Sequence, residues 1–151
     1  MNSTKVSQVR ERGATIVETG ASLAVFLPIL LAMLFVVIEV STAFLIKESL
    51  AQGAREAARA LAVAYGNNPG IATSRSQQNA QVFDTIRIVN IIASSAQFSN
   101  PVFSPNANPP TVTVTATFTS NQNGLPQFPN PDPLHLGANF KLSSTSTYRL
   151  E

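Results

Sequence analysis

The sequence contains no cysteine, which removes several kinds of chemistry from these 151 residues at once. Disulfides, thiolate metal ligands and thiol nucleophiles all require this residue. A small exported domain without disulfides has to obtain its stability from side-chain packing or from assembly with neighbouring proteins.

Histidine and aspartate are nearly as scarce. His135 is the only histidine, and Asp84 and Asp132 are the only aspartates. One histidine cannot form a multi-histidine metal site, no serine lies in a nucleophile-elbow context, and no glycine-rich phosphate loop is present. We therefore expect a protein that is not an enzyme, with no catalytic, cofactor-binding or metal-binding residues and no small-molecule substrate.

Excess positive charge is confined to the start of the chain. The segment Met1–Gly13 has a net charge of +2, which equals the net charge of the whole sequence. Its charged residues are Lys5, Arg10, Glu11 and Arg12. Basic residues next to a membrane segment favour the cytoplasmic side. We interpret this basic excess as a topology signal and expect no binding to nucleic acid.

The one long hydrophobic run, from Thr19 to Ile38, carries no charge. About twenty helical residues cross a hydrocarbon core of roughly 30 Å, so we expect a single membrane span at about 19–38. Because the basic segment precedes the span, the amino terminus is expected in the cytoplasm and the remainder outside. A removed secretory signal is an alternative, although its apolar core usually has only about 7–15 residues.

The helix is expected to continue beyond the membrane. Apolar residues recur there at three- and four-residue steps and form a narrow, alanine-rich face. They are Leu50, Ala54, Ala57, Ala58, Leu61 and Tyr65. The cluster of helix breakers at 66–70 ends the pattern. We therefore predict one helix over residues 14–65, partly in lipid and partly outside.

Residues 70–151 are expected to form a small outer domain. Helical periodicity predicts a second helix from Gln77 to Gln97. Its apolar stripe consists of Val82, Ile86, Val89 and Ala93, widened by Phe83, Ile88, Ile91 and Ile92. Alternation with threonine predicts a strand from Thr111 to Thr119, and a similar alternation predicts a last strand from Phe140 onward. The expected fold class is α+β, with a long membrane-spanning helix, a second helix and two to three antiparallel strands.

A distinct pattern precedes the membrane span: Gly13 is followed by four mostly apolar residues and then by Glu18. A carboxylate at the edge of a span is costly and needs a compensating interaction, and one at a helix start complements the helix dipole. Glycine leaves the backbone unobstructed by a side chain. The pattern resembles the processing site of type IV pilin-like proteins, which implies cleavage by a prepilin peptidase between Gly13 and Ala14.

A closer resemblance rests on a set of short segments. They are Arg12–Glu18, Leu27–Leu31, Ile38–Glu39, Gln52–Ala60 and Thr145–Glu151. These segments resemble the TadE-like pseudopilins, which are minor pilin-like proteins of the tight-adherence (Tad or Flp) type IV pilus system. The resemblance is dense over about residues 10–65 and returns at the last strand. One departure is Thr19, where Tad-type processing motifs commonly have an aromatic residue.

The resemblance implies a structural function in assembling a Tad-type pilus for adhesion or export. Residues 1–13 would be a cytoplasmic leader, and the mature chain would pass once through the bacterial inner membrane or enter the pilus. The implied partners are a prepilin peptidase, other pilin-like subunits, the assembly platform and membrane lipid. In a filament, Glu18 would pair with the new amino terminus at Ala14 of a neighbouring subunit. The alternative is an unprocessed single-pass anchor whose outer domain binds an envelope partner.

Small residues recur at every fourth position of the span. They are Gly20, Ala24, Pro28 and Ala32. Such a stripe permits close contact between helices, but ordinary membrane-helix composition explains it equally well. Pro28 removes the hydrogen bond to the carbonyl of Ala24 and is expected to bend the helix.

The charged residues after the span are expected to be solvated and not to bind partners. A carboxylate at the outer headgroup level needs no partner, and we expect this environment for Glu39. Arg55, Glu56 and Arg59 have the spacing of intrahelical ion pairs, each worth a few tenths of a kcal/mol. We expect these three residues to form a solvated face rather than a partner site.

Overall fold

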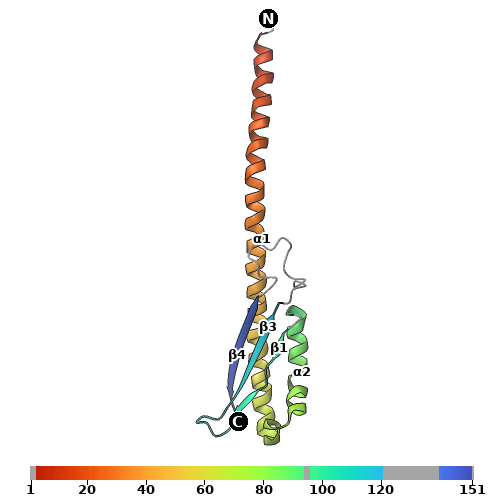
Figure 1. Cartoon of the computed structure of the whole chain (residues 1–151), viewed down its shortest axis with the longest axis vertical. Helices are drawn as coiled ribbons and strands as arrows, with labels where there is room; N and C mark the ends of the chain where they lie inside the picture. The colour runs from red at the N-terminus through yellow and green to blue at the C-terminus, as the bar shows by residue number, and fades with distance from the viewer. Residues whose placement is uncertain (1–2, 94–95, 121–139, 151) are drawn as a thin grey trace.

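The computed structural model describes residues 3–93, 96–120 and 140–150. It shows one long helix that extends well beyond a small domain (Figure 1). In chain order the elements are α1 (Ser3–Asn67), the 3-10 helix η1 (Pro69–Ala72), α2 (Arg75–Ile92), β1 (Gln97–Phe98), β2 (Val102–Ser104), β3 (Thr111–Thr119) and β4 (Lys141–Arg149). The expected α+β class is confirmed, and β1 and β2 are short additional strands of the sheet.

Part of the prediction falls outside the described residues. A turn was expected at 121–124 and a proline-rich loop at 125–137, and this region also contains Asp132 and His135.

Helix α1 is longer than the sequence pattern predicted. It begins at Ser3 rather than near Ala14, and it passes through Gly13 without a break. The residues before Gly13 include Lys, Gln, Arg and Glu, which are good helix formers. The helix also continues through Pro28. It ends at Asn67, where the breakers predicted an end, and Asn68 Oδ1 accepts a hydrogen bond from the Gly70 amide at 3.0 Å.

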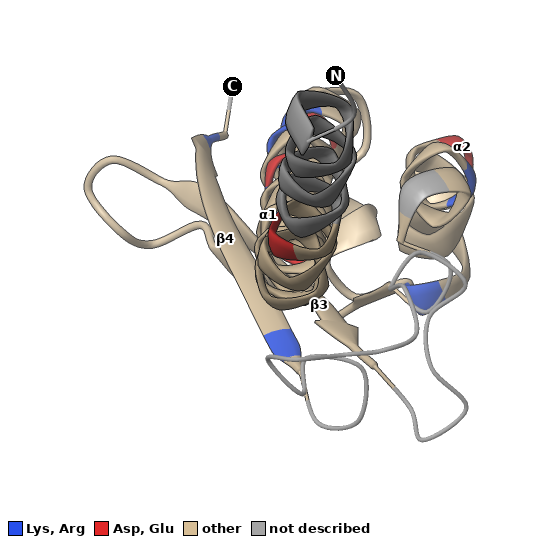
Figure 2. Cartoon of the chain, turned by 90° about the horizontal axis from the view of Figure 1, so that it is seen from above, with Lys and Arg blue, Asp and Glu red and all other residues tan. Residues whose placement is uncertain are grey.

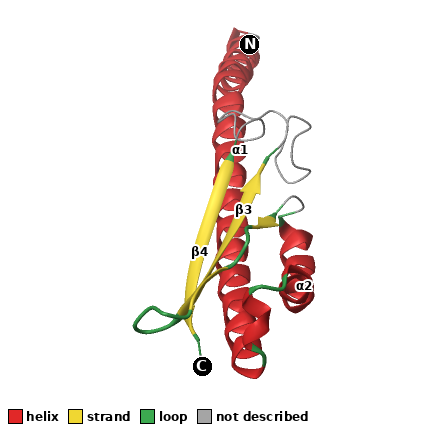
Figure 3. Ribbon diagram, turned by 60° about the horizontal axis from the view of Figure 1, so that its bottom comes forward, coloured by secondary structure: helices red, strands yellow, loops and turns green. Residues whose placement is uncertain are grey.

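The sheet is antiparallel, with β3 paired along both of its edges. On one edge β4 pairs with its whole length, from Thr111 opposite Arg149 to Thr119 opposite Lys141. On the other edge lie β1 and β2. Figure 3 shows this sheet beside α1 and α2. The strand predicted at Thr111–Thr119 is confirmed at both of its bounds.

The two faces of the sheet differ in chemistry. The apolar residues of β3 are buried against the helices: they are Val112, Val114, Ala116 and Phe118. On the opposite face, threonine hydroxyls pair across the strands, with 2.9 Å between Thr113 Oγ1 and Thr147 Oγ1. The Oγ1 atoms of Thr115 and Thr145 are also 2.9 Å apart. The domain therefore has two layers, with both helices on one side of the sheet.

The second half of α1 forms the centre of the domain core. Figure 2 shows α1 between β4 and α2. The fully buried residues of this half of α1 are Ile46, Leu50, Ala54, Ala57, Ala58, Leu61 and Ala62. They divide between two clusters, one with Phe118 and Val89 and the other with Val112 and Val82. The predicted alanine-rich face is confirmed, and the small domain includes this half of α1 as a structural element.

The prediction for α2 was wrong at its end. The helix stops at Ile92 instead of Gln97, and Gln97 opens β1. The main-chain N–H of Ala96 donates to the carbonyl of Ala93 at 2.8 Å, which turns the chain toward the sheet. Pairing of Phe98 with Ala116 on β3 then takes the place of helical hydrogen bonds, because a tertiary interaction overrides a weak local preference.

The apolar stripe of α2 is also narrower than expected. Val82, Val89 and Ala93 are buried and Ile86 is half-buried. Three of the four side chains that were expected to widen the stripe point outward instead. Phe83 is 62% exposed, Ile88 is 64% exposed and Ile91 is 76% exposed.

Helices α1 and α2 pack against each other in close contact at Gly53. A Cβ atom at this position would overlap Cγ2 of Val89 and would lie 3.3 Å from Cζ of Phe98. A Cβ at Gly20, by contrast, would have no neighbour within 4 Å. The domain therefore requires glycine at position 53 for packing.

We predict that Gly53→Ala destabilises the small domain. Overpacking of a core typically costs about 1–3 kcal/mol, whereas replacing a helical glycine by alanine gains at most about 1 kcal/mol. The matched control is Gly20→Ala, which gains helix propensity without any overlap. Thermal unfolding in detergent, followed by the circular dichroism of the sheet, should show a lower Tm for Gly53→Ala only. An equal or higher Tm for that variant would contradict the packing argument.

Candidate functional site

The most prominent surface feature is the uncovered apolar part of α1. Its large apolar side chains that are at least 45% exposed are Val17, Leu23, Val25, Phe26, Leu27, Ile29, Leu30, Leu31, Met33, Leu34, Val37, Val40, Phe44 and Leu45. Within the described ranges, α1 is the one helix long and apolar enough to cross a membrane, and none of its most apolar window is buried by the rest of the chain. Such a helix suggests membrane anchoring.

The residues of the predicted processing site lie inside α1. Gly13 and Ala14 are part of the continuous helix, and Glu18 is exposed on its surface. The first turn of α1 contains no acidic residue, because the helix starts at Ser3. In the full-length chain, Glu18 is therefore remote from the positive end of the helix dipole, which acts within the first turn.

The small-residue stripe is fully available for contact. Gly20, Ala24, Pro28 and Ala32 are all exposed, and nothing within the described chain packs on Gly20. Residues spaced by four positions lie on one side of a helix, each turned by about 40° from the last. The stripe therefore winds slowly around α1 and presents backbone close to the surface.

Glu39 differs from the expectation. It was expected at the outer headgroup level in contact with the surroundings, but its side chain is 0% exposed. The reason is that the rest of the chain begins to cover α1 before Ile46, the first apolar residue of the core on this helix. Phe35 and Val36 are already half-covered, and Glu39 lies on the same side of the helix, about one turn before Ala43 and two before Ile46.

The charged residues of the second half of α1 stay in solvent, as expected. Arg55, Glu56 and Arg59 are exposed, and no ion pair joins them in the described structure. The polar contact on this part of the helix is a hydrogen bond from Gln52 Nε2 to Glu48 Oε1 at 3.1 Å.

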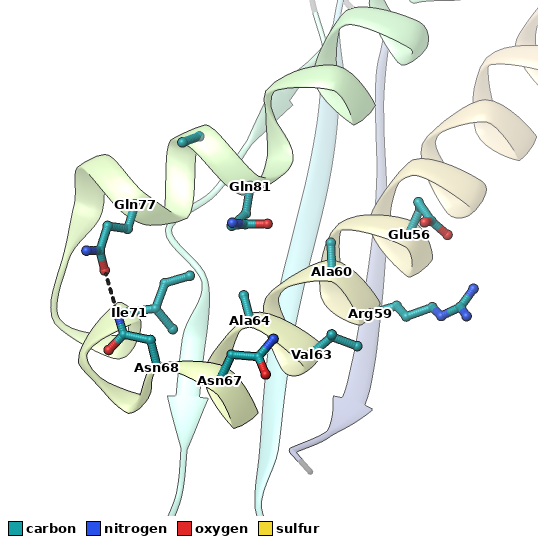
Figure 4. Close-up of a pocket in the computed structure, with 11 residues that line it drawn as sticks. Glu56, Arg59, Ala60, Val63, Ala64, Asn67, Asn68, Ile71, Gln77 and Gln81 are labelled. Carbon is teal, nitrogen blue, oxygen red and sulfur yellow. Dashed lines mark hydrogen bonds between the residues drawn. The ribbon is translucent and has the colours of Figure 1, made fainter.

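A pocket of about 580 Å³ with a mixed polar and apolar lining lies beside the last turns of α1 (Figure 4). It is lined by residues from the end of α1, from η1 and from α2, among them Arg59, Asn67, Asn68, Gln77 and Gln81. Asn68 Nδ2 donates to Gln77 Oε1 at 3.4 Å across its edge. No group of three or more metal-ligating side chains occurs among the residues that the structure describes. The pocket offers amide, guanidinium and carboxylate groups beside apolar side chains.

The chain was compared with models of protein families. Residues 13–59 match the model of the TadE-like protein family. The matched segment begins at the glycine of the predicted processing site and ends within the alanine-rich face of α1. No curated protein and no solved structure matches the chain.

Sequence patterns identified most of these residues, with two exceptions. Gly53 was noticed only as part of the segment Gln52–Ala60, and its packing function depends on Val89, a residue distant in sequence. The burial of Glu39 had no local signal, because its cover comes from other parts of the chain.

We predict that Glu39→Ala destabilises the protein more than Glu48→Ala does. Truncation of a fully buried side chain removes its contacts and leaves a cavity, which should cost about 1–3 kcal/mol. Loss of the exposed Glu48 should cost no more than about 0.5 kcal/mol. The comparison of Tm values for the two full-length variants in detergent tests this difference. Equal Tm values would show that Glu39 is solvated in solution.

Proposed function

The chain is TadE-like over residues 13–59, and on this premise we propose that it is a minor pilin-like subunit, a pseudopilin, of a Tad-type pilus. The observation that carries the proposal is a coincidence of position. The family match starts at Gly13 and spans the helix whose apolar surface is left uncovered by the rest of the chain. Proteins of this family are associated with pili and are not known as enzymes.

The first step of the proposed function is removal of residues 1–13 by a prepilin peptidase. A peptidase needs an extended backbone at the bond that it cuts, so α1 has to unwind locally at Gly13. Glycine is the residue best suited to this step, because it destabilises a helix by roughly 0.5–1 kcal/mol relative to alanine. Its missing side chain also leaves the peptide bond accessible.

Cleavage would change the environment of Glu18. The new helix would begin at Ala14, and the amide groups of residues 14–17 would lose their helical acceptors. Glu18 would then lie about one turn from the positive end of the helix dipole and from a new amino group. The proposed processing thus creates the interaction that the full-length helix lacks.

The second step is assembly. The apolar surface of α1 would pack against other pilin-like helices, with the small-residue stripe from Gly20 to Ala32 allowing a close approach. Glu18 of one subunit would pair with the amino group of Ala14 on a neighbour, which offsets the cost of placing a carboxylate in an apolar environment and fixes the register. The small domain would select the partner subunits.

The proposed location is the bacterial inner membrane, with the amino terminus in the cytoplasm and the small domain outside. The charge distribution supports this orientation, because the basic residues precede the apolar segment. The unbroken course of α1 through Gly13 favours a second candidate function, a single-pass anchor that keeps its leader and binds an envelope partner through the small domain.

We predict that the mature protein begins at Ala14. Intact-mass measurement of membrane-extracted protein should show loss of residues 1–13, and Gly13→Leu should block this loss because a bulky side chain obstructs the peptide bond. Gly20→Ala is the control, since it alters a glycine of the same helix outside the processing site. Wild-type protein that retains Met1–Gly13 would contradict the processing step and support the single-pass anchor.

We also predict that Glu18→Ala leaves leader removal intact but abolishes pilus assembly, because the carboxylate is needed only between subunits. Glu48→Ala, which alters an exposed glutamate of the small domain, should assemble normally. Pili are counted by electron microscopy, and the mature mass is measured on the same cells. Normal piliation of the Glu18→Ala strain would refute the pairing with Ala14.

A further inference from the structure

The burial of Glu39 changes the chemistry of the surface of α1. Glu39 is the only charged residue between Thr19 and Ile46, and it is 0% exposed. The exposed surface of α1 is therefore uncharged well beyond Ile38, and the next exposed charged residues are Lys47 and Glu48. At 1.5 Å per residue, this uncharged surface is about 40 Å long.

Large apolar side chains occupy the added part of this surface. Val40 is 54% exposed, Phe44 is 67% exposed and Leu45 is 60% exposed. We call these three residues the collar. They continue the uncovered apolar surface of α1 without an intervening exposed charge, up to the fully buried Ile46 of the domain core.

The polar side chains beside the collar are satisfied within the helix. Ser41 Oγ donates to the carbonyl of Val37 at 2.7 Å, and Thr42 Oγ1 donates to the carbonyl of Ile38 at 2.8 Å. Such bonds to the preceding turn are the usual arrangement of serine and threonine in helices surrounded by lipid, where water is not available as a partner.

From these observations we propose that the collar contacts the lipid bilayer. The bilayer then extends past Glu39 along α1, and the small domain sits directly against the membrane surface. The uncharged length of about 40 Å exceeds a hydrocarbon core of roughly 30 Å but matches a bilayer with its headgroup layers, about 40–45 Å. Lys47 then lies at the water boundary, where a lysine keeps its charged end hydrated.

Lipid fits the collar better than a protein partner does. The collar has no exposed charge or free hydroxyl through which a protein could be selected, and lipid tails require neither. The collar is also continuous with the helix surface that suggests membrane anchoring. A second copy of the chain that covers the collar is the competing outcome of the test below.

The absence of cysteine makes single-cysteine spin labelling unambiguous. The full chain with a nitroxide at Val40→Cys, Phe44→Cys or Leu45→Cys is reconstituted in vesicles of phosphatidylcholine and phosphatidylglycerol. Collisions of the nitroxide with oxygen, which enriches in lipid, are compared with collisions with a water-soluble nickel chelate. The controls are Leu30→Cys, 61% exposed in the apolar segment, and Val63→Cys, 49% exposed near the far end of α1.

We expect the collar positions to lie between the two controls, with oxygen accessibility above that of Val63→Cys and nickel accessibility several-fold below it, because the interfacial layer partly excludes a polar solute. Nickel accessibility equal to that of Val63→Cys at all three positions would overturn the proposal. Shielding from both reagents that disappears when protein is diluted into excess lipid would overturn it in favour of a second copy.

This inference depends on membrane anchoring of α1 and is independent of leader cleavage. A protein that keeps Met1–Gly13 but shows a lipid-exposed collar would refute the processing step alone. A processed protein with a water-exposed collar would refute the inference alone.

Discussion

One helix has to satisfy two environments along its length, and the rest of the structure follows from that constraint. From Val17 to Leu34, α1 leaves its apolar side chains uncovered on every side. From Phe35 onward the chain covers one side of the same helix, and by Ile46 this side is the centre of a domain core. The change from a fully uncovered helix to a helix covered on one side takes about three turns. The covered positions recur at helical spacing from Phe35 to Ile46 and so lie on one side of α1.

Periodic patterns of apolar residues explain which parts of the fold were predictable from sequence. The strand Thr111–Thr119 alternates threonine with apolar residues, and this local pattern determines both the strand and its buried face. The alanine-rich face of α1 repeats at helical spacing and was predicted for the same reason. The end of α2 was not predictable, because Gln97 and Phe98 leave the helix to pair with Thr117 and Ala116, residues far along the chain.

The candidate site likewise has one part that a local pattern predicts and one part that depends on the three-dimensional fold. Gly13, Ala14 and Glu18 form a pattern of adjacent residues, and the family match begins at the first of them. The environment of Glu39 depends on chain segments that are distant in sequence, so its position at the end of an apolar run suggested a solvated carboxylate where the structure has a buried one. Local patterns thus predict the site, while the extent of the uncovered surface along α1 required the three-dimensional arrangement.

The uninterrupted course of α1 from the anchor into the core also has a mechanical consequence. Successive residues of a helix are rotated by about 100°, so the face of α1 that meets the sheet has a fixed orientation relative to the face that carries Glu18. Because α1 is continuous from Ile38 to Ile46, a torque or a pull applied to its uncovered part is transmitted directly to the sheet. The small domain and the uncovered part of α1 are therefore expected to move as one rigid body rather than as two parts joined by a flexible linker.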